Sequence, residues 1–237
     1  MFVKDWMSTN VITIDVDDSM QQAVRLLKEN NIRMLPVLRN AKLAGVVSDA
    51  DLKRASASDA TLLDIHELLY LISKIKIKDI MTKAPITVPP DFTVEETAQI
   101  LLDHKISGVP VVDEKGRVAG IITRDDLFKV LISLTGLGER GVLFGFQVDD
   151  RPGSIKELTD IVRTYGGRIA SIMSSCDRAP EGFRLVYIRV YDIDRESLSR
   201  LQEELKQQAP MLFVVDHREN KRQIFHDLPI EGPVATL

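Results

Sequence analysis

An internal duplication constrains the fold of this chain more than any other feature of its sequence. The segment "VKDWMSTNVITID" aligns with "IKDIMTKAPITVP", and "NNIRMLPVL" aligns with "HKISGVPVV". Matched residues such as Lys4 and Lys78 lie 74 positions apart, and the interval becomes 75 between Asp51 and Asp126 because one residue enters a turn. A match of this length with a single insertion predicts two copies of one structural unit.

Each copy has the same predicted order of elements, β-α-β-β-α. An extended stretch at Val11 to Ile14 or at Ile86 to Val88 precedes an amphipathic helix. Two short apolar strands and a second helix follow. A copy of roughly 55 residues buries little core by itself, so we expect the copies, at residues 1–56 and 77–134, to pack as a pair. The apolar face of the first helix is predicted to carry Met20, Ala23, Val24 and Leu27 in one copy, and Val94, Thr97, Ala98 and Leu101 in the other.

The segment between the copies, residues 57–76, is predicted to be a polar linker followed by an apolar helix. Its second half carries Leu62, Ile65, Leu69 and Ile72 at helical spacing. We expect this broad apolar surface to be buried against the copies or against a partner subunit.

A glycine-rich segment, "TGLGERG", follows the second copy at residues 135–141. Its glycines match the G-x-G-x-x-G pattern of dinucleotide loops, which requires a strand before the pattern and a helix after it. Here the predicted helix comes first and the strand "VLFGFQV" comes second. We therefore interpret the segment as an interdomain hinge.

From residue 142 to residue 217 the pattern changes to a β-α-β-β-α-β order, which is the ferredoxin-like plan. The strand "VLFGFQV" leads through "DDRPGS" into a helix, and "YGG" ends that helix. The chain as a whole is predicted to be an α+β protein, with the paired copies followed by this ferredoxin-like domain. Residues 218–237 are interpreted as a C-terminal tail, and the patch "HRENKRQ", which begins at His217, is interpreted as solvated.

The composition is typical of a globular protein of the cytoplasm. The 237 residues carry a net charge of −4, which argues against a nucleic-acid partner. Cys176 is the single cysteine, so an internal disulfide and a cysteine-rich zinc site are excluded. No apolar run approaches the roughly 20 residues that span a bilayer, and no secretory signal is recognised. We therefore expect no membrane partner and a cytoplasmic location.

Catalytic and metal-binding residues are not predicted. The four histidines are dispersed, and none has metal-ligand spacing. Cys176 is expected to pack at the end of a strand, and Ser154 lacks the G-x-S-x-G elbow of a nucleophile. Because no nucleophile, base and orienting group can be assembled, we expect a protein that is not an enzyme.

A short motif recurs at the start of the last helix of each copy, from Ser48 to Asp51 and from Thr123 to Asp126. A hydroxyl residue at a helix N-cap, with an acidic residue three positions later, resembles a capping box. A carboxylate that faces a cleft can instead accept hydrogen bonds from the two vicinal hydroxyls of a ribose. Both roles can coexist in one residue, and the duplication favours a ligand site in addition to the cap.

These residues resemble two known families. Both copies have the "hhPVV" strand and the "G-h-h-[ST]-x-x-D-h" ending that are typical of CBS domains. Residues 142–217 resemble an ACT domain, whose signature is the "D-x-P-G" turn. The arrangement of a CBS pair followed by an ACT domain resembles the AcuB group of acetoin utilization proteins.

The resemblance to CBS pairs implies two sites for an adenosine-containing ligand, such as AMP, ADP, ATP or S-adenosylmethionine. In each site the aspartate would hold the ribose, the hydroxyl residue would lie near the phosphates, and the base would contact the first strand. The first site would use Val11, Ile12, Thr13, Arg33, Ser48 and Asp51, and the second would use Pro85, Ile86, Thr87, Thr123, Arg124 and Asp126.

The two implied sites differ in charge. Arg33 aligns with Ser107, and Arg124 aligns with Asp49. Each arginine is a candidate for a phosphate contact or is a solvated surface residue, whereas Asp49 beside a polyphosphate would be unfavourable. We therefore expect the two sites to differ in ligand or in affinity.

The resemblance to ACT domains implies a site for an amino acid at the "DDRPGS" turn. There the backbone amides and the helix N-terminus would receive a carboxylate. The alternative is ordinary helix-start chemistry, with a proline in the first helical turn. The candidate residues are Asp150, Pro152, Gly153, Ser154 and Ile155.

Together the resemblances imply a non-catalytic regulatory protein that forms a homodimer or a higher oligomer and acts on an unidentified target protein. Ligand binding in the CBS pair would pass through the hinge to the ACT domain. Two alternatives stay open. One is an interaction module whose nucleotide sites are vestigial, and the other is an accessory subunit of acetoin breakdown.

Overall fold

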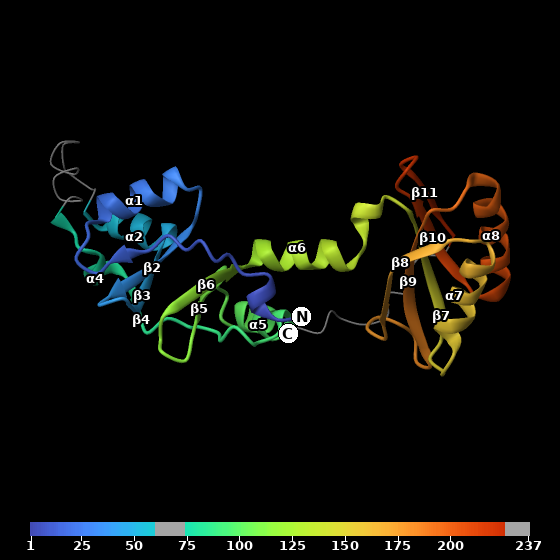
Figure 1. The fold of residues 1–237 in the computed structure, drawn as a ribbon, viewed down its shortest axis with the longest axis horizontal. Helices are drawn as coiled ribbons and strands as arrows, with labels where there is room; N and C mark the ends of the chain where they lie inside the picture. The colour runs from blue at the N-terminus through green and yellow to red at the C-terminus, as the bar shows by residue number, and fades with distance from the viewer. Residues whose placement is uncertain (60–73, 226–237) are drawn as a thin grey trace. The chain divides into compact units, whose positions relative to one another are not determined.

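The computed structural model describes residues 1–59 and 74–225, and the predicted apolar helix from Leu62 to Ile72 lies outside them. The chain divides into two compact units, Met1–Phe128 and Lys129–Leu237 (Figure 1). The boundary falls inside helix α6, Arg124–Leu134. Each unit has a hydrophobic core of its own.

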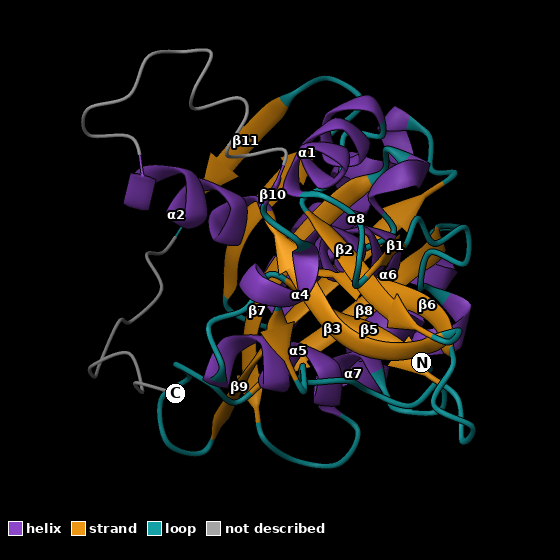
Figure 2. Cartoon of the chain, turned by 90° about the vertical axis from the view of Figure 1, so that its left-hand side faces the viewer, coloured by secondary structure: helices purple, strands orange, loops and turns teal. Residues whose placement is uncertain are grey.

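The first copy of the duplication has the predicted order of elements. Helix α1 begins where Ser19 and Gln22 form a capping box. Its predicted apolar face is buried at Met20, Ala23 and Leu27, and these side chains pack with residues of the neighbouring strands. Strands β2 and β3 run side by side (Figure 1, Figure 2). The elements are β1 (Ile14–Asp15), α1 (Met20–Glu29), β2 (Met34–Arg39), β3 (Lys42–Ser48) and α2 (Asp49–Asp59).

The second copy repeats this order. A capping box between Thr93 and Glu96 opens its first helix, whose Val94, Thr97 and Leu101 are buried. The extended stretch predicted at Ile86 to Val88 is mostly irregular and keeps one isolated bridge, from Val88 to Val111. The elements are α5 (Val94–Asp103), β5 (Gly108–Val112), β6 (Val118–Thr123) and α6.

The segment that leads each copy packs against the other copy. At the N-terminus, η1 (Val3–Asp5) belongs to a stretch in which the Val3 amide donates to the Phe92 carbonyl at 2.8 Å. Conversely, α4 (Ile77–Ile80) and β4 (Thr82–Lys83) lie against the first copy. The Ile77 amide donates to the Asp18 carbonyl at 3.0 Å, and β4 completes a four-stranded sheet in the order β1-β2-β3-β4. The two copies are therefore joined by an exchange of leading segments.

Two glycines at matched positions make this exchange possible. A Cβ on Gly45 would lie 2.7 Å from the Thr82 carbonyl oxygen and 2.8 Å from the sulfur of Met81. A Cβ on Gly120 would contact the sulfur of Met7 and lie 2.8 Å from its Cγ. In each copy, therefore, the glycine contacts a methionine from the leading segment of the other copy: Met81 packs on Gly45, and Met7 packs on Gly120.

The second unit has the predicted β-α-β-β-α-β order. Its antiparallel sheet has the strand order β11-β10-β7-β9-β8, and helices α7 and α8 cover one face of it (Figure 1). Phe144, Ile188 and Leu201 are among the residues of the core between the sheet and the helices. The elements are β7 (Val142–Asp149), α7 (Ser154–Thr164), β8 (Arg168–Ser175), β9 (Phe183–Tyr191), α8 (Arg195–Gln208) and β10 (Met211–Asp216).

The segment interpreted as a C-terminal tail begins with a strand, β11 (Lys221–Ile224), so that interpretation was wrong for these residues. The strand pairs with β10 from Phe213–Ile224 to Asp216–Lys221. All its side chains are exposed, as expected of a solvated segment. An edge strand is held by backbone hydrogen bonds and needs no apolar side chains. The charged sequence therefore gave no indication of a strand here.

The segment interpreted as a hinge is held against the second unit. As predicted, a helix (α6) precedes it and a strand (β7) follows it, with a single turn of 3-10 helix, η2 (Leu137–Glu139), between them. The Thr135 carbonyl accepts hydrogen bonds from Ser171 Oγ at 2.8 Å and from Arg189 Nε at 2.6 Å. The last residues after α6 are therefore fixed to strands β8 and β9.

Candidate functional site

The repeated motif forms a helix cap in the first copy. Ser48 immediately precedes α2, and its backbone amide and Oγ donate to Asp51 Oδ2 at 2.9 Å and 2.6 Å. In return, the Asp51 amide donates to Ser48 Oγ at 3.3 Å. The second carboxylate oxygen, Oδ1, lies 3.4 Å from Arg54 Nη1. The side chain of Asp51 is 12% exposed, so the carboxylate is sheltered but still reaches the surface.

The second copy builds the same cap. The amide and Oγ1 of Thr123 donate to Asp126 Oδ2 at 3.0 Å and 2.7 Å, and the Asp126 amide returns a hydrogen bond to Thr123 Oγ1 at 3.4 Å. Asp126 is only 6% exposed. The cap interpretation is therefore confirmed in both copies, and each cap uses the same carboxylate oxygen.

The charged positions that distinguish the copies are direct neighbours. In the first copy the Asp49 amide donates to the Arg33 carbonyl at 3.1 Å, and in the second the Arg124 amide donates to the Ser107 carbonyl at 3.0 Å. Each copy therefore has one arginine at this junction, although the arginines come from different segments. The Asp49 carboxylate also contacts Lys53 Nζ at 2.6 Å. The first junction thus brings an arginine and an aspartate together through a backbone hydrogen bond, whereas the second brings together an arginine and a serine.

The residues predicted to contact the base lie in irregular segments and not in strands. All six are half-buried: Val11, Ile12 and Thr13 in the first copy, and Pro85, Ile86 and Thr87 in the second. A hollow of about 440 Å³ in the first unit is lined by Thr87 and by none of the other predicted nucleotide-binding residues. Its lining also includes Lys4, Pro89, Pro90, Asp91, Val112, Asp113 and Glu114.

The turn before α7 differs from the predicted helix start. Gly153, at φ +96°, is the N-cap, and the helix begins at Ser154, so Pro152 precedes the helix and is not in its first turn. The Ser154 hydroxyl is bonded to the Arg151 carbonyl at 3.1 Å, and Ile155 packs against the core. The backbone of this turn is thus shaped by a left-handed glycine.

Asp150, the acidic residue of this turn, has partners within the unit. Arg184 Nε donates to Asp150 Oδ1 at 2.8 Å, and the thiol of Cys176 lies 3.7 Å from Oδ2. The contact with Asp150 raises the pKa of Arg184. Cys176 is exposed, so the expectation that it packs at a strand end was wrong. Its position just beyond β8 brings it to the rim of the turn.

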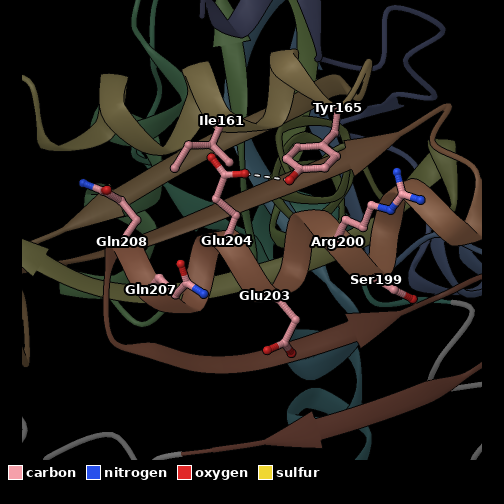
Figure 3. A pocket seen from close by; sticks show the side chains of 8 residues that line it. All are labelled: Ile161, Tyr165, Ser199, Arg200, Glu203, Glu204, Gln207 and Gln208. Atoms are coloured by element: carbon pink, nitrogen blue, oxygen red, sulfur yellow. Dashed lines mark hydrogen bonds between the residues drawn. The ribbon is translucent and has the colours of Figure 1, made fainter.

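A second hollow, of about 760 Å³, lies on α7 and α8 and contains none of the predicted site residues (Figure 3). At its centre the Tyr165 hydroxyl donates to Glu204 Oε2 at 2.6 Å, which raises the pKa of Tyr165. The ring of Tyr165 is partly buried and packs against the core of the second unit. Ile161, Ser199, Arg200, Glu203, Gln207 and Gln208 complete the lining.

Two searches for further functional features cover residues 1–59 and 74–225. Within these ranges no three histidine, cysteine, aspartate or glutamate side chains stand close enough to hold a metal ion. None of the helices in the same ranges is long and apolar enough to cross a membrane.

The fold and the repeated cap define a tandem-repeat protein, in which two β-α-β-β-α copies precede a β-α-β-β-α-β domain. Residues 3–58 and 77–133 match the family model of the CBS domain. A CBS domain-containing protein of Dictyostelium discoideum is 33% identical over 135 residues, which make up 93% of that protein and 56% of this chain. The chain belongs to the CBS domain-containing proteins.

Two solved structures are also similar to the paired copies. The CBS domain pair of protein MJ0100, in complex with 5'-methylthioadenosine and S-adenosyl-L-methionine, is 32% identical with a TM-score of 0.48 and covers 55% of this chain and 99% of that one. A protein from Vibrio cholerae assigned to acetoin utilization (AcuB) is 28% identical with a TM-score of 0.49 and covers 59% of this chain and 96% of that one.

Proposed function

We propose that this chain is a non-catalytic regulatory protein whose CBS pair binds an adenosine-containing ligand at two sites. The observation that carries the proposal is the duplicated carboxylate. Asp51 and Asp126 hold the same position at the start of α2 and α6, with one oxygen used by the cap and both side chains largely withdrawn from water. A cap alone does not require a buried carboxylate, because the exposed Gln22 completes the cap with Ser19 at the start of α1.

In this proposal the cap orients the carboxylate for the ribose. Hydrogen bonds from the backbone amide and the hydroxyl fix the plane of the carboxylate. An ionised carboxylate then accepts hydrogen bonds from two vicinal hydroxyls, which are stronger than bonds between neutral groups. Arg33 and Arg124 extend from the matched junctions and supply the cations that phosphates require, and the six half-buried residues of the irregular segments contact the base.

The second unit is proposed to be an ACT domain that receives a small molecule such as an amino acid. The β-α-β-β-α-β order and the left-handed Gly153 at the start of α7 support this part of the proposal. The amides from Gly153 to Ile155 would receive the carboxylate, and the paired Asp150 would fix the turn. The segment after α6, held by Arg189 and Ser171, would pass ligand binding from one unit to the other, and a homodimer is proposed as the working state.

Calorimetry of the full chain with AMP, ADP, ATP and S-adenosylmethionine tests the nucleotide sites. We expect at least one of the four to bind, and a ligand at 100 times its Kd to add about 2.7 kcal/mol to the free energy of unfolding. Asp51→Asn and Asp126→Asn keep an oxygen for the cap and remove the charge, so each should weaken binding at its own site.

The neighbouring aspartates provide matched controls. Asp49 and Asp125 lie in the first turns of the same helices and are exposed, so Asp49→Asn and Asp125→Asn should not weaken ligand binding. If none of the four ligands binds, or if the double Asp51→Asn, Asp126→Asn variant binds as tightly as the wild type, the carboxylates only cap their helices. The chain would then be an interaction module with vestigial sites.

A further inference from the structure

One face of the sheet in the second unit is not covered by its helices. In β9, Val186, Ile188 and Val190 point into the core beneath α7 and α8. Because side chains alternate along a strand, Tyr187 and Arg189 point to the opposite, open face. That face therefore carries a buried arginine in β9, an inner strand of the sheet.

The strand register places a second arginine in the same row. Arg189 lies opposite Leu143 of β7, Leu143 lies opposite Val215 of β10, and Val215 lies opposite Arg222 of β11. His217 follows the end of β10, and it lies close enough to Arg189 and Arg222 for both charges to act on it. Leu143, Val215 and His217 are half-buried and leave this end of the face partly open to water.

Arg189 has an incomplete set of hydrogen bonds. It is 3% exposed, and its Nε donates to the Thr135 carbonyl at 2.6 Å. Its Nη1 is buried and has no hydrogen-bond partner, and no carboxylate among residues 1–59 and 74–225 forms an ion pair with it. Burial lowers the pKa of Arg189 because the charged guanidinium has lost its water. A buried charge without a counter-ion is costly, so this arrangement calls for an anion.

Other arginines of the unit show the contrast. Arg184, in the same strand, pairs with Asp150, and Arg218 pairs with Asp216 at 2.9 Å. Both of these side chains are more exposed than Arg189. The most deeply buried of the three guanidinium groups is thus the one with no carboxylate partner in the described parts of the chain.

Further positive charge gathers around this position. The pKa of His217 is lowered, first by burial and then by the nearby charges of Arg189 and Arg222. The acidic residue beside His217, Asp216, is already engaged by Arg218 through both carboxylate oxygens, at 3.1 Å and 2.9 Å. The positive charge of the cluster of Arg189, His217 and Arg222 therefore comes from the two arginines, and His217 adds a ring N–H donor.

We infer that this cluster is a binding site for the oxyanion of a small molecule, a carboxylate or a phosphate group. Arg189 offers Nη1, Arg222 lies on the edge strand β11, and His217 follows the end of β10. The site lies near the start of β7, whereas the turn at Asp150 follows the end of that strand. It is therefore distinct from the amino-acid site proposed above, and the same guanidinium would hold both the anion and the chain segment after α6.

Titration of the full chain with inorganic phosphate and with acetate, at constant ionic strength, tests this site and separates the two sources of oxyanion. We expect saturable binding of at least one probe in calorimetry. Arg189→Lys should weaken it by about tenfold or more, because a lysine cannot reproduce the second donor of the guanidinium. Arg218→Lys is the matched control, since its guanidinium already has a carboxylate, and it should leave binding unchanged.

Two more sets of variants keep the test decisive if Arg189→Lys folds poorly. His217→Ala and Arg222→Gln leave the Thr135 contact in place and should each weaken anion binding by about twofold to fivefold. A double Arg33→Gln, Arg124→Gln variant should bind the probes normally, which separates this site from the proposed nucleotide sites. The inference fails if neither probe saturates, if Arg218→Lys weakens binding as much as Arg189→Lys, or if His217→Ala and Arg222→Gln change nothing.

Discussion

The two copies of the first unit have the same helix caps and different surroundings. Ser48 and Asp51 form the same hydrogen bonds as Thr123 and Asp126, with closely similar lengths. Around the first cap, Arg33 lies beside Asp49, whose carboxylate pairs with Lys53, whereas at the junction of the second cap Arg124 lies beside Ser107. The two copies thus share the hydroxyl and carboxylate groups that cap the helix and differ in the charged residues beside the cap.

The largest expected effect concerns the exchanged segments, at the matched glycines. Gly45→Ala would press a methyl group against the Thr82 carbonyl, which is backbone, whereas Gly120→Ala would press mainly on the flexible Met7 side chain. We expect losses in the free energy of unfolding of about 3 kcal/mol for Gly45→Ala and about 1 kcal/mol for Gly120→Ala. Urea unfolding followed by the fluorescence of Trp6, the single tryptophan, measures both.

A double-mutant cycle sharpens this comparison. Met7→Ala should relieve most of the strain of Gly120→Ala, because it removes the crowded side chain. Met81→Ala should relieve little of the strain of Gly45→Ala, because the Thr82 carbonyl remains. Equal rescue in both copies would contradict the geometry of the exchange.

The next effect concerns the two capping aspartates. Asp126 is the more buried, and its removal leaves the amide and hydroxyl of Thr123 without their partner. We expect Asp126→Ala to lower the free energy of unfolding by about 2 kcal/mol, and Asp51→Ala by about 1 kcal/mol. The same unfolding experiment compares them, and a larger loss for Asp51→Ala would mean that burial does not set the strength of the cap.

A smaller effect should appear in ligand binding. Removing the charge of Asp49 makes the first junction resemble the second, so Asp49→Asn should raise the affinity for ATP by about twofold to fivefold. Arg124→Gln should lower it by a similar factor at the second site. Calorimetry measures both changes, and an affinity for ATP that is insensitive to either variant would break the proposed difference between the sites.

The smallest effect distinguishes the first helices of the two copies by pH. Hydrogen bonds from Thr93 lower the pKa of Glu96 below its ordinary value of 4.5, whereas the matching cap of α1 uses the neutral Gln22. A lowered folded pKa gives stability that is complete above pH 4.5 and is lost as pH falls through the folded pKa. Glu96→Gln should abolish this acid-dependent loss, which urea midpoints at about pH 6 and about pH 3.5 would detect.

Local patterns predicted the order of elements in both units because periodicity and capping depend on residues close in sequence. The buried faces of α1 and α5 and the β-α-β-β-α-β order follow directly from them. The exchange of leading segments was not predictable, since "VKDWM" and "IKDIM" both carry apolar residues at the same spacing. Either arrangement buries a similar surface, and only the tertiary structure distinguishes them.

The site was predictable to a similar depth. The sequence motif identified the capping carboxylates, but it does not predict how deeply each one is buried. Pro152 was misplaced because a left-handed glycine, and not the proline, sets the start of α7. Arg189 lies in "FRLVYIRVY", where alternation predicts a solvent-facing charge. Its burial results from the Thr135 segment, which is distant in sequence, so a local pattern could not reveal it.

The crossed leading segments also set an order of events during synthesis. Residues near the N-terminus leave the ribosome first, yet Ser8 finds its bridging partner only at Ile121. The first copy in turn gains its outer strand only when Thr82 and Lys83 have emerged. Neither copy therefore has its full set of native contacts until part of the other copy has been synthesised.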